Sequence, residues 1–179
     1  PVEIRTAEDA EQREKLWAGR KGALGALGRL APNYYLIDGT IPRTKLVEVM
    51  ARIKEISKES GYPIANVLHA GDGNLHPCVL FDERKPGDVE NITKVGEQIL
   101  KLCVDVGGVL SGEHGIGTEK QAYMPFMFSE DDMAAMALLK VAFDTKNMLN
   151  PGKVFPVSDG RTGISQMGAI SRAGAGAFI

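Results

Sequence analysis

The residues best suited to chemistry are the three histidines, because all of them lie in glycine-framed loops or at expected strand ends. His69 and His76 flank one loop, and His114 follows directly after Glu113 in another. Imidazole nitrogens bind Zn²⁺ and other first-row divalent ions at about 2.0–2.1 Å, which requires several side chains to converge on one point. The two loops are therefore the candidate metal site.

The first loop joins two apolar runs, Ile64 to Leu68 and Leu75 to Phe81, through the segment 70–74, Ala-Gly-Asp-Gly-Asn. This pattern predicts a β-hairpin with a connection longer than the two-residue minimum. The chain doubles back there, so His69 and His76 can face the same point. Two histidines do not fill a metal shell, and the alternative is a pair of polar residues at an ordinary turn.

The second loop is Ser-Gly-Glu-His-Gly-Ile-Gly, residues 111–117, and its glycines let the backbone approach a ligand closely. Adjacent residues in an extended segment point in opposite directions, so we expect Glu113 to face a metal and His114 another part of the cavity. Two histidines and one carboxylate leave open positions for a substrate oxygen. The alternative is a tight loop whose glutamate caps a backbone group.

Weaker candidates for binding a substrate are Asn74 in the first loop and the pair Arg20-Lys21. Asp72 and Asn74 are of types that usually bond their own backbone, although Asn74 could also touch a substrate. Arg20 and Lys21 could hold a carboxylate, since a guanidinium binds it through two parallel hydrogen bonds. The alternative is that both residues favour the C-terminal end of a helix.

An α+β domain is expected to position these loops. Apolar periodicity predicts strands at 34–38, 64–68, 75–81 and 109–110, a helix from Pro42 to Gly61 and another over 88–106, with 39–42 as a turn. The order is strand, helix, strand, strand, helix, strand. It is typical of the ferredoxin-like split βαβ arrangement, an antiparallel sheet with helices on one face.

Further helices are expected at both ends of the chain. Thr6 and Asp9 indicate a capped helix of three or four turns that fades over Gly19 to Gly28. Ser129 caps a last helix, which the sequence Asn150-Pro-Gly closes. The core stripe of that last helix is expected at Met133, Met136, Leu139 and Phe143. Residues 157–179 are rich in glycine, alanine and serine and are expected to form a flexible tail.

Composition narrows the class of protein. A chain of 179 residues fits one domain, and a net charge of −2 without a basic block makes a nucleic-acid partner unexpected. Its apolar runs are all too short to span a membrane. Cys78 and Cys103 lie among apolar residues, as buried free thiols do in a reducing cytoplasm. Because the chain starts at Pro1 rather than Met, we expect a piece of a longer protein.

Two histidine motifs, at 69–76 and 111–117, together with Asn150-Pro-Gly-Lys153, resemble the C-terminal domain of FAD-linked oxidases. The family is of the VAO type and includes glycolate oxidase catalytic subunits and the D-lactate and D-2-hydroxyglutarate dehydrogenases. Segments 17–21 and 38–42 are also similar, so the resemblance covers roughly residues 10–156. It implies a substrate-side portion, 1–156, of a flavoenzyme that oxidises glycolate or D-lactate, without the N-terminal domain that mainly holds FAD.

The resemblance also implies roles for individual residues. His69, His76 and Glu113 would hold a divalent Zn, Mn or Fe ion, and His114 would be the base that takes the hydroxyl proton. Hydride would pass to the flavin, which His114 and Asn150 are expected to contact. Substrate contacts are expected from Arg20, Lys21 and Asn74. Pro77-Cys78, where 2-hydroxyglutarate-specific relatives carry polar residues, favours a smaller acid.

Partners and location follow from the same resemblance. Relatives of the glycolate type work beside a second flavin subunit and an iron–sulfur subunit, so the expected place is the cytoplasm, including the inner face of the membrane. The chain alone is expected to lack turnover. Two other functions stay open: a metal-dependent hydrolase, which would act without flavin, and a non-catalytic ferredoxin-like module, in which replacing His69 or Glu113 would change nothing.

Overall fold

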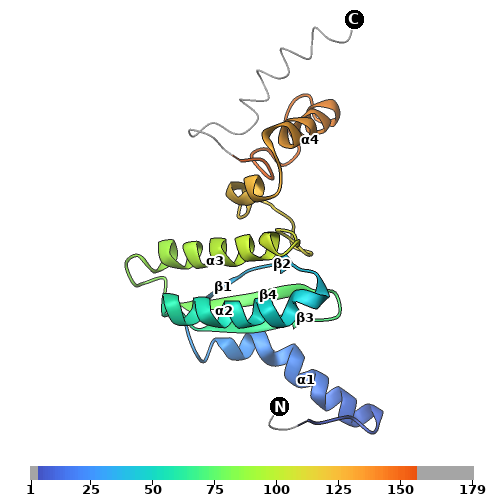
Figure 1. The fold of residues 1–179 in the computed structure, drawn as a ribbon, viewed down its shortest axis with the longest axis vertical. Helices are drawn as coiled ribbons and strands as arrows, with labels where there is room; N and C mark the ends of the chain where they lie inside the picture. Colours follow the sequence, from blue (N-terminus) through green and yellow to red (C-terminus); the bar gives the residue numbers. More distant parts are fainter. Residues whose placement is uncertain (1–3, 157–179) are drawn as a thin grey trace, which may run out of the picture.

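The computed structural model describes residues 4–156 and shows a small sheet flanked by helices (Figure 1). Figure 1 also shows α4 beyond α3, away from the sheet. In chain order the elements are α1 (Ala10–Leu27), β1 (Asn33–Leu36), β2 (Gly39–Thr40), the short 3-10 helix Arg43–Lys45, α2 (Leu46–Ser60), β3 (Ile64–His69), β4 (Asn74–Phe81), α3 (Asp88–Asp105), a second 3-10 helix Gln121–Phe126 and α4 (Glu130–Phe143).

The sheet is antiparallel and has β4 at its centre. β1 and β2 pair with the same edge of β4 in one register, so they form a single strand interrupted at residues 37–38. β3 pairs with the other edge of β4, and Val109 bridges to Thr40 on the outside. The order of the expected strands is therefore fourth, first, third, second, which confirms the α+β split βαβ arrangement.

Two details of the sheet differ from expectation. Residues 39–42 were expected to be a turn, but Gly39 and Thr40 continue the first strand as β2. The strand expected at 109–110 is a single bridge at Val109. Both differences have one cause: these segments contain too few residues with strand periodicity, and their pairing is set by long-range contacts.

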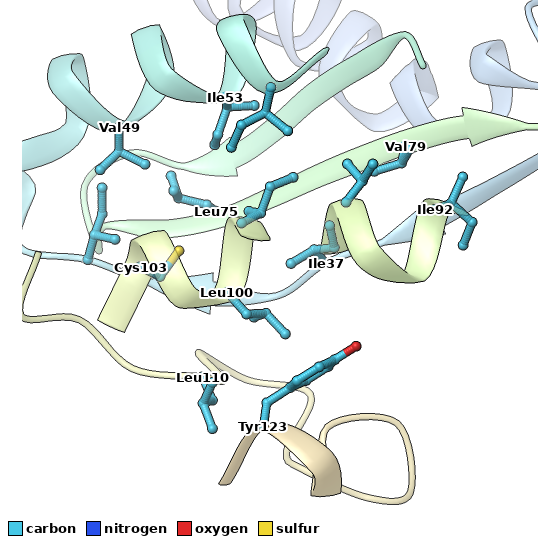
Figure 2. Close-up of a cluster of buried hydrophobic side chains, with 14 of the residues drawn as sticks. Ile37, Val49, Ile53, Leu75, Val79, Ile92, Leu100, Cys103, Leu110 and Tyr123 are labelled. Atoms are coloured by element: carbon cyan, nitrogen blue, oxygen red, sulfur yellow. The ribbon is translucent and has the colours of Figure 1, made fainter. Parts of the chain in front are cut away.

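α2 and α3 cover one face of the sheet, and the main hydrophobic core lies between them and β4. Figure 2 shows Val49 and Ile53 of α2 pointing toward Leu75 and Val79 of β4, with the apolar side chains of α3 beside them. Val49 and Ile53 have no solvent exposure, as the helical period predicts. Gly61 ends α2 with φ 76°, in the left-handed region that glycine adopts most readily.

The C-terminal end of α1 covers part of the opposite face. Leu24 and Leu27 pack there against Cys78 and Leu80 of β4, in a second and smaller cluster. Because successive side chains of a strand point to opposite faces, β4 supplies Leu75 and Val79 to one cluster and Cys78 and Leu80 to the other. This two-sided packing explains why β4 is buried along nearly its whole length.

α1 is longer than expected and begins at a different residue. Its N-cap is Asp9, whose side chain accepts a hydrogen bond from the Gln12 amide at 2.7 Å, rather than Thr6. The helix continues to Leu27 through Gly19, Gly22 and Gly25. Each glycine disfavours a helix by about 1 kcal/mol relative to alanine, and packing of the last turn against β4 offsets this cost.

α4 begins as expected and packs differently. Ser129 caps it and forms a capping box with Asp132. Met133 and Met136 pack against the core, but Leu139 and Phe143 are 64% and 86% exposed, so the expected core stripe is wrong in its second half. The expected tail, 157–179, lies outside the described residues. Within residues 4–156, the helices are too short or too polar to cross a membrane.

The two thiols provide a test of this packing. Burial raises the pKa of the Cys103 thiol to about 12 and raises that of Cys78 above its usual value. Since only the thiolate reacts, we expect neither cysteine of the native chain to react with an aromatic disulfide reagent at pH 8. Both should react at once in guanidinium chloride, followed by absorbance. Rapid reaction of either thiol in the native chain would contradict the packing.

Candidate active site

The histidine loops meet on the sheet face that α1 covers only in part. His69 ends β3 and pairs with Asn74, and His76 pairs with Val67 two residues further along. Strand alternation places Asn74 and His76 on the same face as Cys78, opposite the α2–α3 core. The hairpin therefore directs both imidazoles to the face of the sheet on which the last turn of α1 packs.

Glu113 lies among the three histidines. Its Oε1 is 2.9 Å from His76 Nε2, 3.7 Å from His69 Nε2 and 3.9 Å from His114 Nε2. Ligand atoms of His69, His76 and Glu113 all lie within 4.8 Å of one another. The structure thus brings together two imidazoles and one carboxylate, from segments far apart in the sequence.

His114 is placed differently from its expected position. It was expected to face another part of the cavity, but its ring stacks on His76, with centroids 5.1 Å apart and planes at 14°. The reason is that the loop is not extended: Gly115 has φ 80°, and the preceding amides turn toward one carboxylate. His76 is almost fully buried, whereas His69, Glu113 and His114 remain about half exposed.

That carboxylate belongs to Asp38, which lies fully buried at the interruption between β1 and β2. It accepts hydrogen bonds from Ser111 Oγ at 2.7 Å and from the amides of Gly112, Glu113 and His114 at 3.0–3.3 Å. Ser111 Oγ also accepts a bond from the Gly115 amide at 2.7 Å. Asp38 therefore fixes the backbone on both sides of the Glu113 and His114 side chains.

Lys120 neutralises Asp38 from the other side. Its Nζ lies 3.0 Å from Asp38 Oδ2 and 2.8 Å from the Asp38 carbonyl oxygen, and its side chain is 2% exposed. Burial alone would raise the pKa of Asp38. Hydrogen bonds from Ser111, the His114 amide and Lys120 outweigh it and hold the pKa well below its usual range.

The Asp38 carboxylate also lies close to two imidazoles. Ligand atoms of Asp38, His76 and His114 fall within 4.8 Å of one another, as those of the first cluster do. However, the Lys120 ammonium already neutralises Asp38, and the loop amides and Ser111 bond both carboxylate oxygens. A second cation there would be repelled by the ammonium. The cluster around Glu113 is therefore the one suited to a metal.

Gln121 joins the second loop to the segment that contains Asn150. Its Nε2 donates to the Gly117 carbonyl at 3.1 Å and to the Gly152 carbonyl at 2.6 Å, and the Val154 amide donates to Gly117 at 2.7 Å. Asn150 has φ 47° and lines an apolar hollow of about 420 Å³. Further residues lining it include Leu139, Phe143, Leu149 and Phe155.

Arg20 and Lys21 lie in the same cleft as His69. The cleft measures about 460 Å³ and is also lined by Trp17 and by the hairpin loop through Asp72. Both basic residues are inside α1, six or more residues before its end at Leu27, so they do not serve its C-terminus. This placement favours the carboxylate-binding interpretation over the alternative.

Other expected contacts are buried. Asn74 is 7% exposed, and its Oδ1 lies against Gly112 under the second loop, so its contact with a substrate stays a prediction. Pro77 and Cys78 are enclosed within the sheet. Their apolar character reflects packing of β4 and gives no indication of substrate size.

Sequence reasoning missed Asp38, Lys120 and Gln121 as residues that position the site. Asp38 appeared only within a motif that the family shares, and a lone lysine after a glycine loop is usually solvated. One signal was available: an aspartate directly after the apolar run 34–37, at a position that the sheet must bury. A buried carboxylate requires partners, and these come from the second loop.

The chain matches the family model described as FAD linked oxidases, C-terminal domain, over residues 2–154. It is 47% identical to glycolate oxidase subunit GlcD of Escherichia coli K12 over 155 residues, which are 87% of this chain and 31% of that protein. It is 37% identical to the GlcD subunit of Bacillus subtilis over 86% of this chain and 33% of that protein. It is 34% identical to the mitochondrial D-lactate dehydrogenase [cytochrome] of Kluyveromyces lactis, over 84% of this chain and 27% of that protein.

Gly112 provides a test of how closely the second loop fits the sheet. A Cβ at this position would lie 2.3 Å from Asn74 Oδ1 and 2.6 Å from Thr40 Oγ1. We expect Gly112→Ala to lower the free energy of unfolding by about 1–3 kcal/mol, because both side chains or the loop itself must move. Denaturant unfolding followed by circular dichroism measures the change.

The control is Gly22→Ala in α1, where an added Cβ meets nothing within 4 Å. It should stabilise the chain slightly, because alanine favours a helix by up to about 1 kcal/mol relative to glycine. If both substitutions changed stability in the same direction and by the same amount, the close contact at Gly112 would be contradicted.

Proposed function

Because the chain belongs to the FAD-linked oxidases through their C-terminal domain, we propose that it forms the substrate-binding portion of a flavoenzyme oxidising 2-hydroxy acids. Glycolate and D-lactate are the acids we propose, since the relatives are named glycolate oxidase subunits and D-lactate dehydrogenases. The observation that carries the proposal is the convergence of His69, His76 and Glu113 beside a cleft lined by Arg20 and Lys21.

The proposed activity needs more protein than this chain provides. The chain spans about a third of the length of the curated relatives it matches. We propose that FAD is held mainly by the part of the enzyme that corresponds to the remaining two thirds. His114 and Asn150 are the proposed flavin contacts on this side: both are exposed, and the hollow beside Asn150 is lined largely by apolar groups.

The donor set fits a divalent metal. Imidazole nitrogen and carboxylate oxygen are ligands for Zn, Mn and Fe, and three protein ligands leave positions free for a substrate. His69 and Glu113 are each about half exposed, and His69 also lines the cleft. We propose His69, His76 and Glu113 as the ligands. When bound, the metal would act as a Lewis acid toward a substrate oxygen, while the flavin would accept hydride.

Arg20, Lys21 and His114 act on the substrate directly in this proposal. Arg20 and Lys21 hold its carboxylate through charge-assisted hydrogen bonds, which orients the hydroxyl-bearing carbon. An imidazole nitrogen of His114 takes the hydroxyl proton, since His114 is half exposed and stacked beside the proposed ligand His76. In the proposal Asn74 supports these contacts from beneath the second loop, next to Gly112.

We propose further subunits as partners, because the bacterial relatives carry the word subunit in their names. A second flavin subunit and an iron–sulfur subunit would accept the electrons that the flavin receives. We also propose a cytoplasmic location, with the inner face of the membrane included. Cys78 and Cys103 support it, since both are free, buried thiols and a reducing compartment keeps them so.

The metal site can be tested on the chain as it is. After treatment with a chelator and reconstitution with Zn²⁺, Mn²⁺ or Fe²⁺, we expect near-stoichiometric metal by elemental analysis. Glu113→Gln keeps the size of the side chain but removes its charge. It should weaken binding by more than the roughly 10–100-fold that loss of an outer partner causes. His69→Ala should behave in the same way.

Glu97→Gln is the matched control, since Glu97 is exposed on α3 and belongs to neither ligand cluster. It should bind metal as the unchanged chain does. Absence of metal from the unchanged chain after reconstitution, or equal binding by the Glu97 and Glu113 variants, would contradict the proposed ligands.

The carboxylate cleft is tested by titrating the metal-loaded chain with glycolate and D-lactate and following chemical shifts by NMR. Arg20→Gln should raise the dissociation constant by about tenfold, the effect of losing a charge-assisted bond worth roughly 1.5 kcal/mol. Arg13→Gln makes the same charge change in the same helix, outside the cleft, and should have little effect. Equal weakening by both variants would indicate non-specific attraction instead.

A further inference from the structure

We propose that the buried Asp38–Lys120 pair, acting through Ser111, sets the metal affinity of the site by holding the loop that carries Glu113 and His114. This inference rests on the proposed metal site and concerns residues that do not touch the metal. Asp38, Ser111 and Lys120 are positioning residues in this proposal. It deepens the proposed function by saying what fixes the geometry of its ligands.

Contacts outside the Asp38 cluster hold the end of the loop at Ile116 and Gly117, so the part that carries Glu113 and His114 depends on Asp38. Residues 111–117 form neither a helix nor a strand, and Glu113 is 52% exposed, so apart from the contact with His76 its position owes little to side-chain packing. The direction of that side chain therefore depends on its backbone. The backbone in turn is fixed by the amides of Gly112, Glu113 and His114, which all donate to Asp38.

Ser111 ties the two ends of this turn together. Its Oγ donates to Asp38 Oδ2 at 2.7 Å and accepts from the Gly115 amide at 2.7 Å. One hydroxyl thus links the buried carboxylate to the residue after His114. Loss of that hydroxyl would free the C-terminal side of the turn without removing a charge from the interior.

Lys120 provides the counter-charge that allows the Asp38 carboxylate to be buried. A carboxylate with no solvent exposure is strongly disfavoured unless it is paired, and the ammonium 3.0 Å away provides the pair. Lys120 also follows the loop in the chain. Residues 111–114 and residue 120 therefore bind the same aspartate, which closes the segment between them into a loop fixed at both ends.

Asp38 positions the ligands rather than serving as one. Although its carboxylate lies near His76 and His114, both oxygens accept hydrogen bonds from the loop, and one is paired with the ammonium. Preorganisation of this kind increases affinity because the loop does not have to be ordered when the metal binds. Outer partners of metal ligands typically change affinity by roughly 10–100-fold.

The test compares Ser111→Ala with Ser111→Thr. Each variant of the whole 179-residue chain is titrated with Zn²⁺ alone, in competition with a chromophoric chelator. Ser111→Ala should weaken Zn²⁺ binding by about 10–100-fold. Ser111→Thr keeps the hydroxyl and should restore most of the affinity. Circular dichroism and a cooperative melting transition check that each variant is folded before it is titrated.

Ser57→Ala is the matched control. The Ser57 hydroxyl donates to the Tyr62 carbonyl at 2.8 Å, a comparable half-buried bond remote from the histidine loops. It should alter the melting temperature and leave the Zn²⁺ dissociation constant unchanged. Equal Zn²⁺ affinities for Ser111→Ala and the unchanged chain would overturn the inference, as would equal weakening by Ser111→Ala and Ser57→Ala. Absence of Zn²⁺ binding by the unchanged chain would instead overturn the proposed metal site itself.

Discussion

The buried charge of Asp38 is the constraint on which the rest of the site depends. No water reaches this carboxylate, so the protein itself must supply its hydrogen bonds and its counter-charge. Ser111 and the amides of the second loop supply the bonds, and Lys120 supplies the charge. The loop conformation that places Glu113 and His114 beside His76 is therefore also the one that supplies the hydrogen bonds of Asp38. Stability and site geometry share the same contacts here.

The sheet separates packing from chemistry by its two faces. Strand alternation sends Leu75 and Val79 into the core beneath α2 and α3, while His76 points to the opposite side. α1 covers only part of that opposite side. Its last turn packs on Cys78 and Leu80, and Arg20, about one to two turns earlier, lines the cleft beside His69. The same helix thus closes the small core and contributes to the cleft.

How much could be predicted from the sequence depended on the range of the contacts involved. The periodic helices and the hairpin were predictable because their signals lie within a few residues, as for Val49 and Ile53. The two histidine loops were recognisable as a candidate site from residue type. The Asp38–Lys120 pair joins residues 82 positions apart, and no local pattern indicates it. Leu139 and Phe143 have helical spacing but stay exposed. Periodicity identifies the apolar face of a helix, but it does not say which element packs against that face.

The exposure of the candidate ligands indicates where the rest of a complete enzyme would lie. His76 is buried in the sheet, whereas His69, Glu113 and His114 are each about half exposed. Closing an active site expels water from the reacting atoms, and residues 4–156 leave these three side chains about half exposed. In the proposed function, the flavin-bearing portion closes over these three residues. The substrate would then lie between a metal site held by this chain and a redox centre supplied by the rest of the enzyme.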